Sequence, residues 1–157
     1  MRKRIYMETT IPSYLTARPS RDIVQAARQQ LTREWWDSER HSYVLCISQI
    51  VLDEAAAGNE DAAQRRMAVL ADLPLLDLTL DVDELALKIM ASGLLPERAS
   101  RDAIHIAVAC VHHVDFLLTW NCRHIANATI LRDLQNIIVD AGYEMPVICT
   151  PEELIGD

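Results

Sequence analysis

Short, continuous runs of apolar residues alternate along the chain with longer stretches in which apolar positions recur every three or four residues. A run of about four to eight apolar residues is typical of a buried strand, and the longer spacing is typical of an amphipathic helix. The pattern predicts strands at 4–8, 43–48, 75–79, 116–119 and 146–150. It predicts helices at about 12–17, 21–40, 49–57, 60–72, 81–92, 100–113 and 129–141.

Strands that alternate with helices are typical of βαβ units, which form an α/β fold with a mostly parallel sheet covered on both faces. The run at 43–48, YVLCIS, is apolar until its last residue, and such runs favour a parallel sheet because both of its faces are buried. At 157 residues the chain is predicted to form one domain, spanning 1–157. Ligands of such sheets bind beyond the carboxyl ends of the strands, so we look for chemistry there.

Charge and composition narrow the classes of function. The formal net charge of −8 argues against a broad basic surface for duplex nucleic acid. The four glycines fit neither of the common glycine-rich phosphate loops. Lys3 and Lys88 are the only lysines, and the other basic residues are arginines, which suit bidentate phosphate contacts. No secretory signal or apolar run of membrane length is visible, so we expect a cytoplasmic protein with no membrane partner.

Acidic side chains are associated with the first two predicted strands. Glu8 ends the first strand, within YMETTIPSYL. In the helix after the second strand, Glu54 shares a stripe with Ile50 and Val51, whereas helical geometry rotates Asp53 about 100° away. We therefore expect Glu54 to face the interior. The alternatives are a surface position for Glu8 and a boundary position for Glu54.

Two more polar residues flank the apolar helix predicted at 100–113. Asp102 lies in its first turn, where the helix dipole by itself favours a negative charge by about 0.3–1 kcal/mol. Asn121 follows the strand at 116–119, where asparagine is also a common turn residue. His105 is spaced to share a face with Asp102, but the pattern assigns it no specific role.

If these side chains converge, three carboxylates and one amide form a site of hard oxygen ligands. Such sites suit Mg²⁺ or Mn²⁺, which retain water ligands and bind substrate phosphates. Carboxylates alone would repel a phosphodiester, and a bound cation turns this repulsion into attraction. The sequence therefore favours a Mg²⁺ or Mn²⁺ site at the carboxyl edge of the sheet.

The chain resembles the PIN domain, and within it the VapC-like toxins of type II toxin–antitoxin pairs. The resemblance covers nearly the whole chain and rests on YMETTIPSYL, ISQIVLDEAAAG, SRDAIHIAVACVHHVDFLLTWNCRHIAN and VICTPEELI. It implies a three-layer fold with a five-stranded sheet in the order 3-2-1-4-5, flanked by helices on both faces. It also implies a quartet of catalytic, metal-binding residues for RNA cleavage, which falls on Glu8, Glu54, Asp102 and Asn121.

Two positions depart from the family pattern, which has aspartate at the first and fourth sites. Glu8 is longer than aspartate by one methylene, which moves its carboxylate by roughly 1.3 Å. Asn121 is neutral, so the quartet carries one negative charge fewer. One Mg²⁺ or Mn²⁺ ion is still expected to bind, because waters and carbonyl groups complete its coordination, whereas a second ion is disfavoured.

The resemblance predicts a metal-dependent endoribonuclease that hydrolyses RNA, with Thr119 supporting the acids by hydrogen bonding. RNA is the expected substrate, and a homodimer and a cognate antitoxin are the expected assemblies. The competing interpretation is a PIN-like module with weakened catalysis that acts in RNA binding or protein interaction. Arginines that flank the site are candidates for phosphate contact, with a solvated surface position as the alternative for each: Arg18, Arg21, Arg98, Arg101 and Arg123.

Overall fold

The sheet has five strands in the computed structural model, which describes residues 1–156. All neighbouring strands are parallel, and their order is β3-β2-β1-β4-β5. The predicted α/β class and strand order are confirmed, and the sheet is parallel throughout. The strands are β1 (Lys3–Met7), β2 (Tyr43–Ser48), β3 (Leu75–Leu76), β4 (Phe116–Leu118) and β5 (Val147–Cys149).

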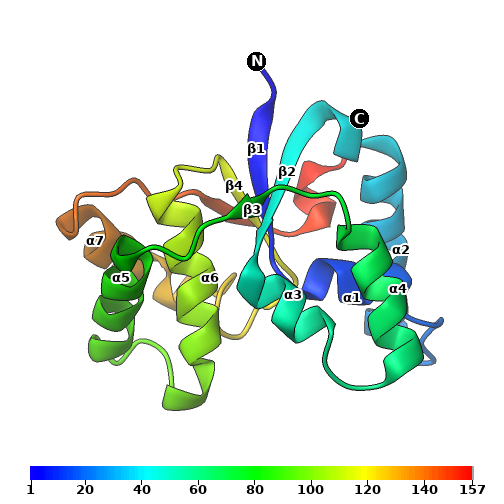
Figure 1. The fold of residues 1–157 in the computed structure, drawn as a ribbon, viewed down its shortest axis with the longest axis horizontal. Helices are drawn as coiled ribbons and strands as arrows, with labels where there is room; N and C mark the ends of the chain where they lie inside the picture. The colour runs from blue at the N-terminus through cyan, green and yellow to red at the C-terminus, as the bar shows by residue number, and fades with distance from the viewer. Residues whose placement is uncertain (157) are drawn as a thin grey trace.

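The α-helices of the described chain are α1 (Thr10–Thr16), α2 (Ile23–Ser38), α3 (Gln49–Ala55), α4 (Glu60–Leu70), α5 (Leu80–Ala91), α6 (Ser100–Val111) and α7 (Ala128–Asp140). Helices α1 to α4 lie on one side of the sheet and α5 to α7 on the other (Figure 1). Short 3₁₀ turns occur at Arg40–Ser42, Glu97–Ala99 and Pro151–Leu154. No helix among the described residues has both the length and the apolar character needed to span a membrane.

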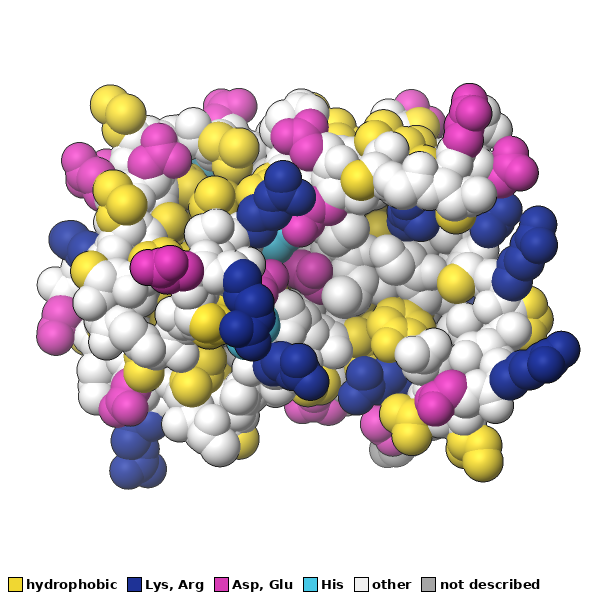
Figure 2. Space-filling view, turned by 90° about the horizontal axis from the view of Figure 1, so that it is seen from below, with side chains coloured by type: hydrophobic (Ala, Val, Ile, Leu, Met, Phe, Trp, Pro, Cys, Tyr) yellow, Lys and Arg dark blue, Asp and Glu magenta, His cyan; other side chains and the backbone are white. Residues whose placement is uncertain are grey.

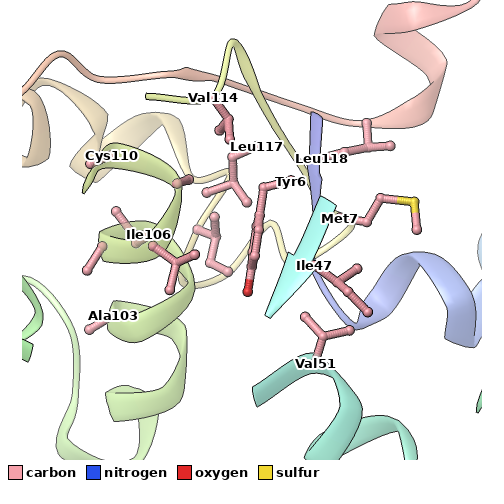
Figure 3. Packing of buried hydrophobic residues seen from close by; sticks show 14 of the residues in the cluster. Tyr6, Met7, Ile47, Val51, Ala103, Ile106, Cys110, Val114, Leu117 and Leu118 are labelled. Carbon is pink, nitrogen blue, oxygen red and sulfur yellow. The ribbon is translucent and has the colours of Figure 1, made fainter. Parts of the chain in front are cut away.

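The centre of the sheet is its most buried part. Tyr6 and Met7 of β1 and Leu117 and Leu118 of β4 are inaccessible to solvent. Successive side chains of a strand point to opposite faces, and the side chains of Tyr6 and Met7 leave β1 on opposite sides, toward α6 and toward α1 (Figure 3). The phenol ring of Tyr6 therefore lies beside α6, with its hydroxyl directed toward the carboxyl edge of the sheet (Figure 3).

Helix α6 is apolar on nearly every side and is buried along most of its length. It lies beside the sheet and packs against α5, as expected of a helix that has no wide polar face (Figure 1). His105 lies within this run and has no exposed surface. Because buried polar groups in proteins are hydrogen-bonded, the imidazole requires partners inside the fold.

Several predicted elements are longer in the sequence pattern than in the structure, and for two of them the contact that sets the boundary is clear. The strand predicted at 75–79 ends at Leu76, because its neighbour β2 ends at Ser48, directly opposite Leu76 in the register. The helix predicted at 21–40 begins only at Ile23, because the Asp22 side chain accepts a hydrogen bond from the Gln25 amide and caps the helix there. In both cases a specific partner sets the boundary.

The strand order places a switch point between β1 and β4. From β1 the chain proceeds outward through β2 to β3, and from β4 it proceeds outward to β5. At such a point the connections leave the carboxyl ends of the two central strands in opposite directions, and a crevice forms between them. Strand β1 begins at the top of Figure 1, so this carboxyl edge lies at the bottom of that view.

Candidate metal centre

Glu8, Glu54 and His105 form a cluster at the carboxyl edge of the sheet. One ligand atom from each residue lies within 4.8 Å of those from the other two, which is close enough for the three to share a metal ion. Glu8 directly follows β1, Glu54 lies on α3, and His105 lies on α6. Figure 2 looks onto this edge and shows acidic side chains and a histidine within a hollow, with Lys or Arg side chains beside it. We call these three residues the Glu–His cluster.

Glu8 is nearly inaccessible and is held through one oxygen. Its Oε1 accepts hydrogen bonds from the backbone amide and hydroxyl of Thr10 and from the Thr119 hydroxyl, the last at 2.7 Å. Burial raises the pKa of the Glu8 carboxyl, and the nearby His105 and the threonine donors offset this only in part. Oε2 accepts no hydrogen bond from the described residues.

Glu54 is half-buried and is also anchored through Oε1. This oxygen accepts hydrogen bonds from the Thr9 hydroxyl and from His105 Nε2, both at 2.6 Å. Burial opposes ionisation of Glu54, but the hydrogen bond and charge of His105, the Thr9 hydroxyl and the charge of Arg101 outweigh it and lower the pKa. Asp53 is exposed and binds the side chain of Gln49, so the predicted inward orientation of Glu54 is confirmed.

A buried chain of hydrogen bonds leads from Ser48 through Tyr6 and His105 to Glu54. The Ser48 hydroxyl lies 2.8 Å from the Tyr6 hydroxyl, which lies 2.7 Å from His105 Nδ1. An ionised carboxylate only accepts hydrogen bonds, so His105 Nε2 carries the proton that Glu54 accepts. Ser48 consequently occupies the N-cap position of α3 without a capping side-chain bond. In this arrangement His105 fixes the orientation of Glu54 and directs an N–H, not a lone pair, at the carboxylate.

The donor set fits a hard divalent cation. Glu8 and Glu54 each use Oε1 for protein hydrogen bonds, and Oε2 of each accepts none from the described residues. Mg²⁺ is usually bound by one or two carboxylates and otherwise by waters and substrate phosphates. Two anchored carboxylates with free oxygens match that requirement, and they would hold Mg²⁺ or Mn²⁺.

Asp102 and Asn121 both contact His124. Asp102 Oδ2 lies 3.0 Å from His124 Nδ1, and Asn121 Oδ1 accepts a hydrogen bond from the His124 amide, also at 3.0 Å. The Asn121 carbonyl also accepts from the amides of Ile125 and Ala126, so Asn121 closes the turn after β4. The Asp102 carboxylate is not part of the group formed by the ligand atoms of Glu8, Glu54 and His105.

Thr119 connects Glu8 with the turn at Asn121. Its hydroxyl donates to Glu8 Oε1 and accepts from the Asn121 amide at 2.9 Å, so the hydrogen bond expected of this residue is present. The next amide, of Trp120, donates to the Thr10 hydroxyl, which itself donates to Glu8. The segment after β4 is therefore tied to the segment after β1.

The five candidate arginines are exposed, and one of them acts on the cluster. The charge of Arg101 contributes to the lowered pKa of Glu54. Within residues 1–156, no lysine or arginine forms an ion pair with a carboxylate, since the two ion pairs present both involve histidine. The guanidinium groups that flank this edge are therefore available for anions. The exposed candidates are Arg18, Arg21, Arg98, Arg101 and Arg123.

The residue pattern did not identify Tyr6, His105 or His124 as members of the site. Tyr6 and His105 lie in apolar runs, where side chains normally serve packing. The only local signal was the spacing of His105 from Asp102, and in the structure His105 binds Glu54 instead. The chain matches no protein-family model and no curated protein.

Proposed function

We propose that this chain is a PIN-type, metal-dependent endoribonuclease that hydrolyses RNA phosphodiester bonds. The observation that carries the proposal is the pair of glutamates at the carboxyl edge of a 3-2-1-4-5 parallel sheet. Oε1 of each glutamate is anchored by hydrogen bonds, and Oε2 accepts none from the described residues. A bound Mg²⁺ or Mn²⁺ ion would neutralise charge on the phosphodiester and activate the attacking water.

The chain's own residues would divide the remaining work. Glu8 and Glu54 hold the cation, and the threonine hydroxyls keep their Oε1 atoms in place. His105 positions Glu54 through its Nε2–H. Asp102, supported by His124, provides a further carboxylate on the helix that carries His105. Positioning of this kind matters because loss of such support commonly lowers metal affinity about 10- to 100-fold.

The wider assignment to a VapC-like toxin is part of the same proposal. It rests on the sequence segments that resemble this family and on the agreement of the strand order with its fold. It predicts a homodimer and a neighbouring antitoxin that inhibits cleavage. Size-exclusion chromatography with light scattering tests the first prediction, and co-purification with the product of an adjacent small gene tests the second.

The decisive experiment compares two neighbouring acids of α3. Cleavage of a fluorescent single-stranded RNA is measured with Mg²⁺, Mn²⁺ or a chelator, using the wild type, Glu54→Gln and Asp53→Asn. We expect Glu54→Gln to lower the rate about 100-fold or more, because it removes an anchored ligand. Asp53→Asn makes the same charge change on an exposed residue and is expected to retain activity. Cleavage that survives chelation or Glu54→Gln would come from a contaminating nuclease and would contradict the proposal.

A second candidate function is a PIN-like module that binds RNA without cutting it. The geometry of Asn121 favours this alternative, because its side-chain oxygen is engaged by the His124 amide and it adds no charge to the site. This candidate predicts RNA binding by the wild type and no metal-dependent cleavage over a broad RNA panel.

A further inference from the structure

A pocket with three arginines lies at the end of α1. Its volume is about 370 Å³, and Arg18, Arg65 and Arg66 line it together with Thr16 and Asp61. Arg18 follows α1, and the other two arginines lie on α4. The pocket therefore gathers positive charge from two segments that are far apart in the sequence. We call these three residues the arginine pocket.

Two of the three guanidinium groups are held in place by backbone carbonyls. Arg65 Nε donates to the Thr16 carbonyl at 3.1 Å. Arg66 donates through Nε to the Ala55 carbonyl at 2.9 Å and through Nη2 to the Ala57 carbonyl at 2.7 Å. Both terminal nitrogens of Arg65 and Nη1 of Arg66 make no hydrogen bond to the described residues. These donors are thus oriented and available to a ligand.

The arginine pocket has an excess of positive charge. Its three guanidinium groups form no ion pair within residues 1–156, although Asp61 lines the same cavity. The other lysines and arginines of residues 1–156 are also without ion pairs, so what distinguishes this pocket is that three guanidinium groups line one cavity. A planar guanidinium presents paired N–H donors that match the oxygens of a phosphate. The chemistry of the pocket is therefore that of a phosphate site.

The arginine pocket lies close to the Glu–His cluster. Helix α1 begins at Thr10, which binds Glu8, and ends at Thr16, which binds Arg65. Seven residues of helix span about 10 Å. Arg66 contacts the carbonyl of Ala55, the residue that follows Glu54. Helix α1 and the end of α3 thus connect the two sites over a distance that one nucleic acid strand can cover.

We infer that the arginine pocket binds a backbone phosphate of a single-stranded RNA whose scissile phosphate lies at the Glu–His cluster. This inference rests on the proposed function and adds a defined subsite to it. Arg18 is a phosphate candidate from the sequence, whereas Arg65 and Arg66 are identified only by the fold. The pocket supplies affinity without reading the base sequence, because its contacts are to phosphate.

The test measures RNA binding separately from cleavage. Fluorescence anisotropy of a labelled single-stranded RNA of about ten nucleotides is recorded in chelator over a range of salt concentrations. The variants are Arg18→Gln, Arg65→Gln and Arg132→Gln. Arg18→Gln removes no side-chain hydrogen bond to the described residues, so it leaves the fold intact. Arg132 is exposed on α7, on the opposite side of the sheet from α4 (Figure 1), and it serves as the matched control for loss of one charge.

We expect Arg18→Gln and Arg65→Gln each to weaken RNA binding about three- to tenfold and to reduce the salt slope by about 0.7. Arg132→Gln is expected to change the affinity by less than about twofold. Weakened binding in the first two variants supports the inference even if no variant cleaves RNA, which would remove only the catalytic proposal. Equal affinity in all four proteins, or no RNA binding by the wild type, overturns the inference, whatever the cleavage assay shows.

Discussion

The two halves of the candidate site differ in how their polar side chains are held. Glu8 and Glu54 are fixed through Oε1 by threonine hydroxyls and His105, and their Oε2 atoms remain free. Asp102 and Asn121 both contact His124, and the oxygen of Asn121 is used to close a turn. A place at a strand end is therefore not sufficient to identify a ligand. What distinguishes the two glutamates is that at least two donors hold Oε1 of each, whereas the Asp102 carboxylate has one side-chain contact, to His124.

The largest expected difference between the halves is in metal-dependent stability. At a free Mn²⁺ or Mg²⁺ concentration of about 100 times the Kd, the free energy of unfolding of the wild type should rise by about 2.7 kcal/mol. Glu54→Gln should abolish this gain, because it removes an anchored ligand, and Asp102→Asn should keep more than half of it. Urea denaturation with metal and with chelator measures both. Equal losses in the two variants would show that both halves hold the ion and would remove the distinction.

A second prediction concerns the hydrogen bonds beneath Glu54. Tyr6→Phe leaves the Ser48 hydroxyl and His105 Nδ1 without a partner, which should lower the free energy of unfolding by about 1–3 kcal/mol. It should also weaken metal binding about tenfold, because Glu54 loses part of its support.

The matched control for this prediction is Tyr14→Phe. The Tyr14 hydroxyl makes no hydrogen bond to the described residues, so its removal should change stability by less than about 0.5 kcal/mol. Calorimetric titration with Mn²⁺ and urea denaturation give the two readouts. Unchanged metal affinity in Tyr6→Phe would mean that the hydrogen-bond chain serves packing alone.

A third prediction separates Glu8 from Glu54 by their pH dependence in chelator. The folded protein raises the pKa of Glu8 above the ordinary value of 4.5. Its stabilising contribution to the free energy of unfolding is therefore full below pH 4.5, and it is lost as the pH rises through the pKa of the folded state. The folded protein lowers the pKa of Glu54, so its contribution is present above 4.5 and is lost as pH falls.

Two variants test these opposite signs. Near neutral pH, Glu8→Gln should be more stable than the wild type, and Glu54→Gln should be less stable. Both differences should shrink as the pH falls below the ordinary glutamate range. Urea denaturation across this range gives the free energies of unfolding. The same sign of change in both variants would contradict the assigned environments.

The smallest expected effect is that of Asn121→Asp. The new carboxylate can still accept the His124 amide, and it restores the missing charge of the quartet. Mn²⁺ affinity should rise, but by no more than about fivefold, because one added charge at a partly exposed position contributes about 1 kcal/mol at most. Cleavage at limiting metal should rise in parallel and disappear when Glu54→Gln is added. No cleavage in any variant would favour the RNA-binding module.

The local spacing of apolar residues was sufficient to predict much of the architecture. The helical spacing of α3 predicted that Glu54, and not Asp53, faces inward, and the structure confirms it. Apolar runs without alternation predicted parallel strands, because burial on both faces removes the polar alternation. The resemblance to the PIN family supplied the strand order, which periodicity alone cannot determine.

The sequence by itself determined which segments form strands and helices and which acids stand near strand ends, because these depend on spacings of a few residues. Only the tertiary structure decided how the polar groups pair. Glu54 meets His105 across 51 positions of sequence, and Glu8 meets Thr119 across 111. Such partners carry no local signal, because a buried hydrogen bond depends on where two distant segments cross. The fold therefore decided that His105 supports Glu54 and that Thr119 supports Glu8.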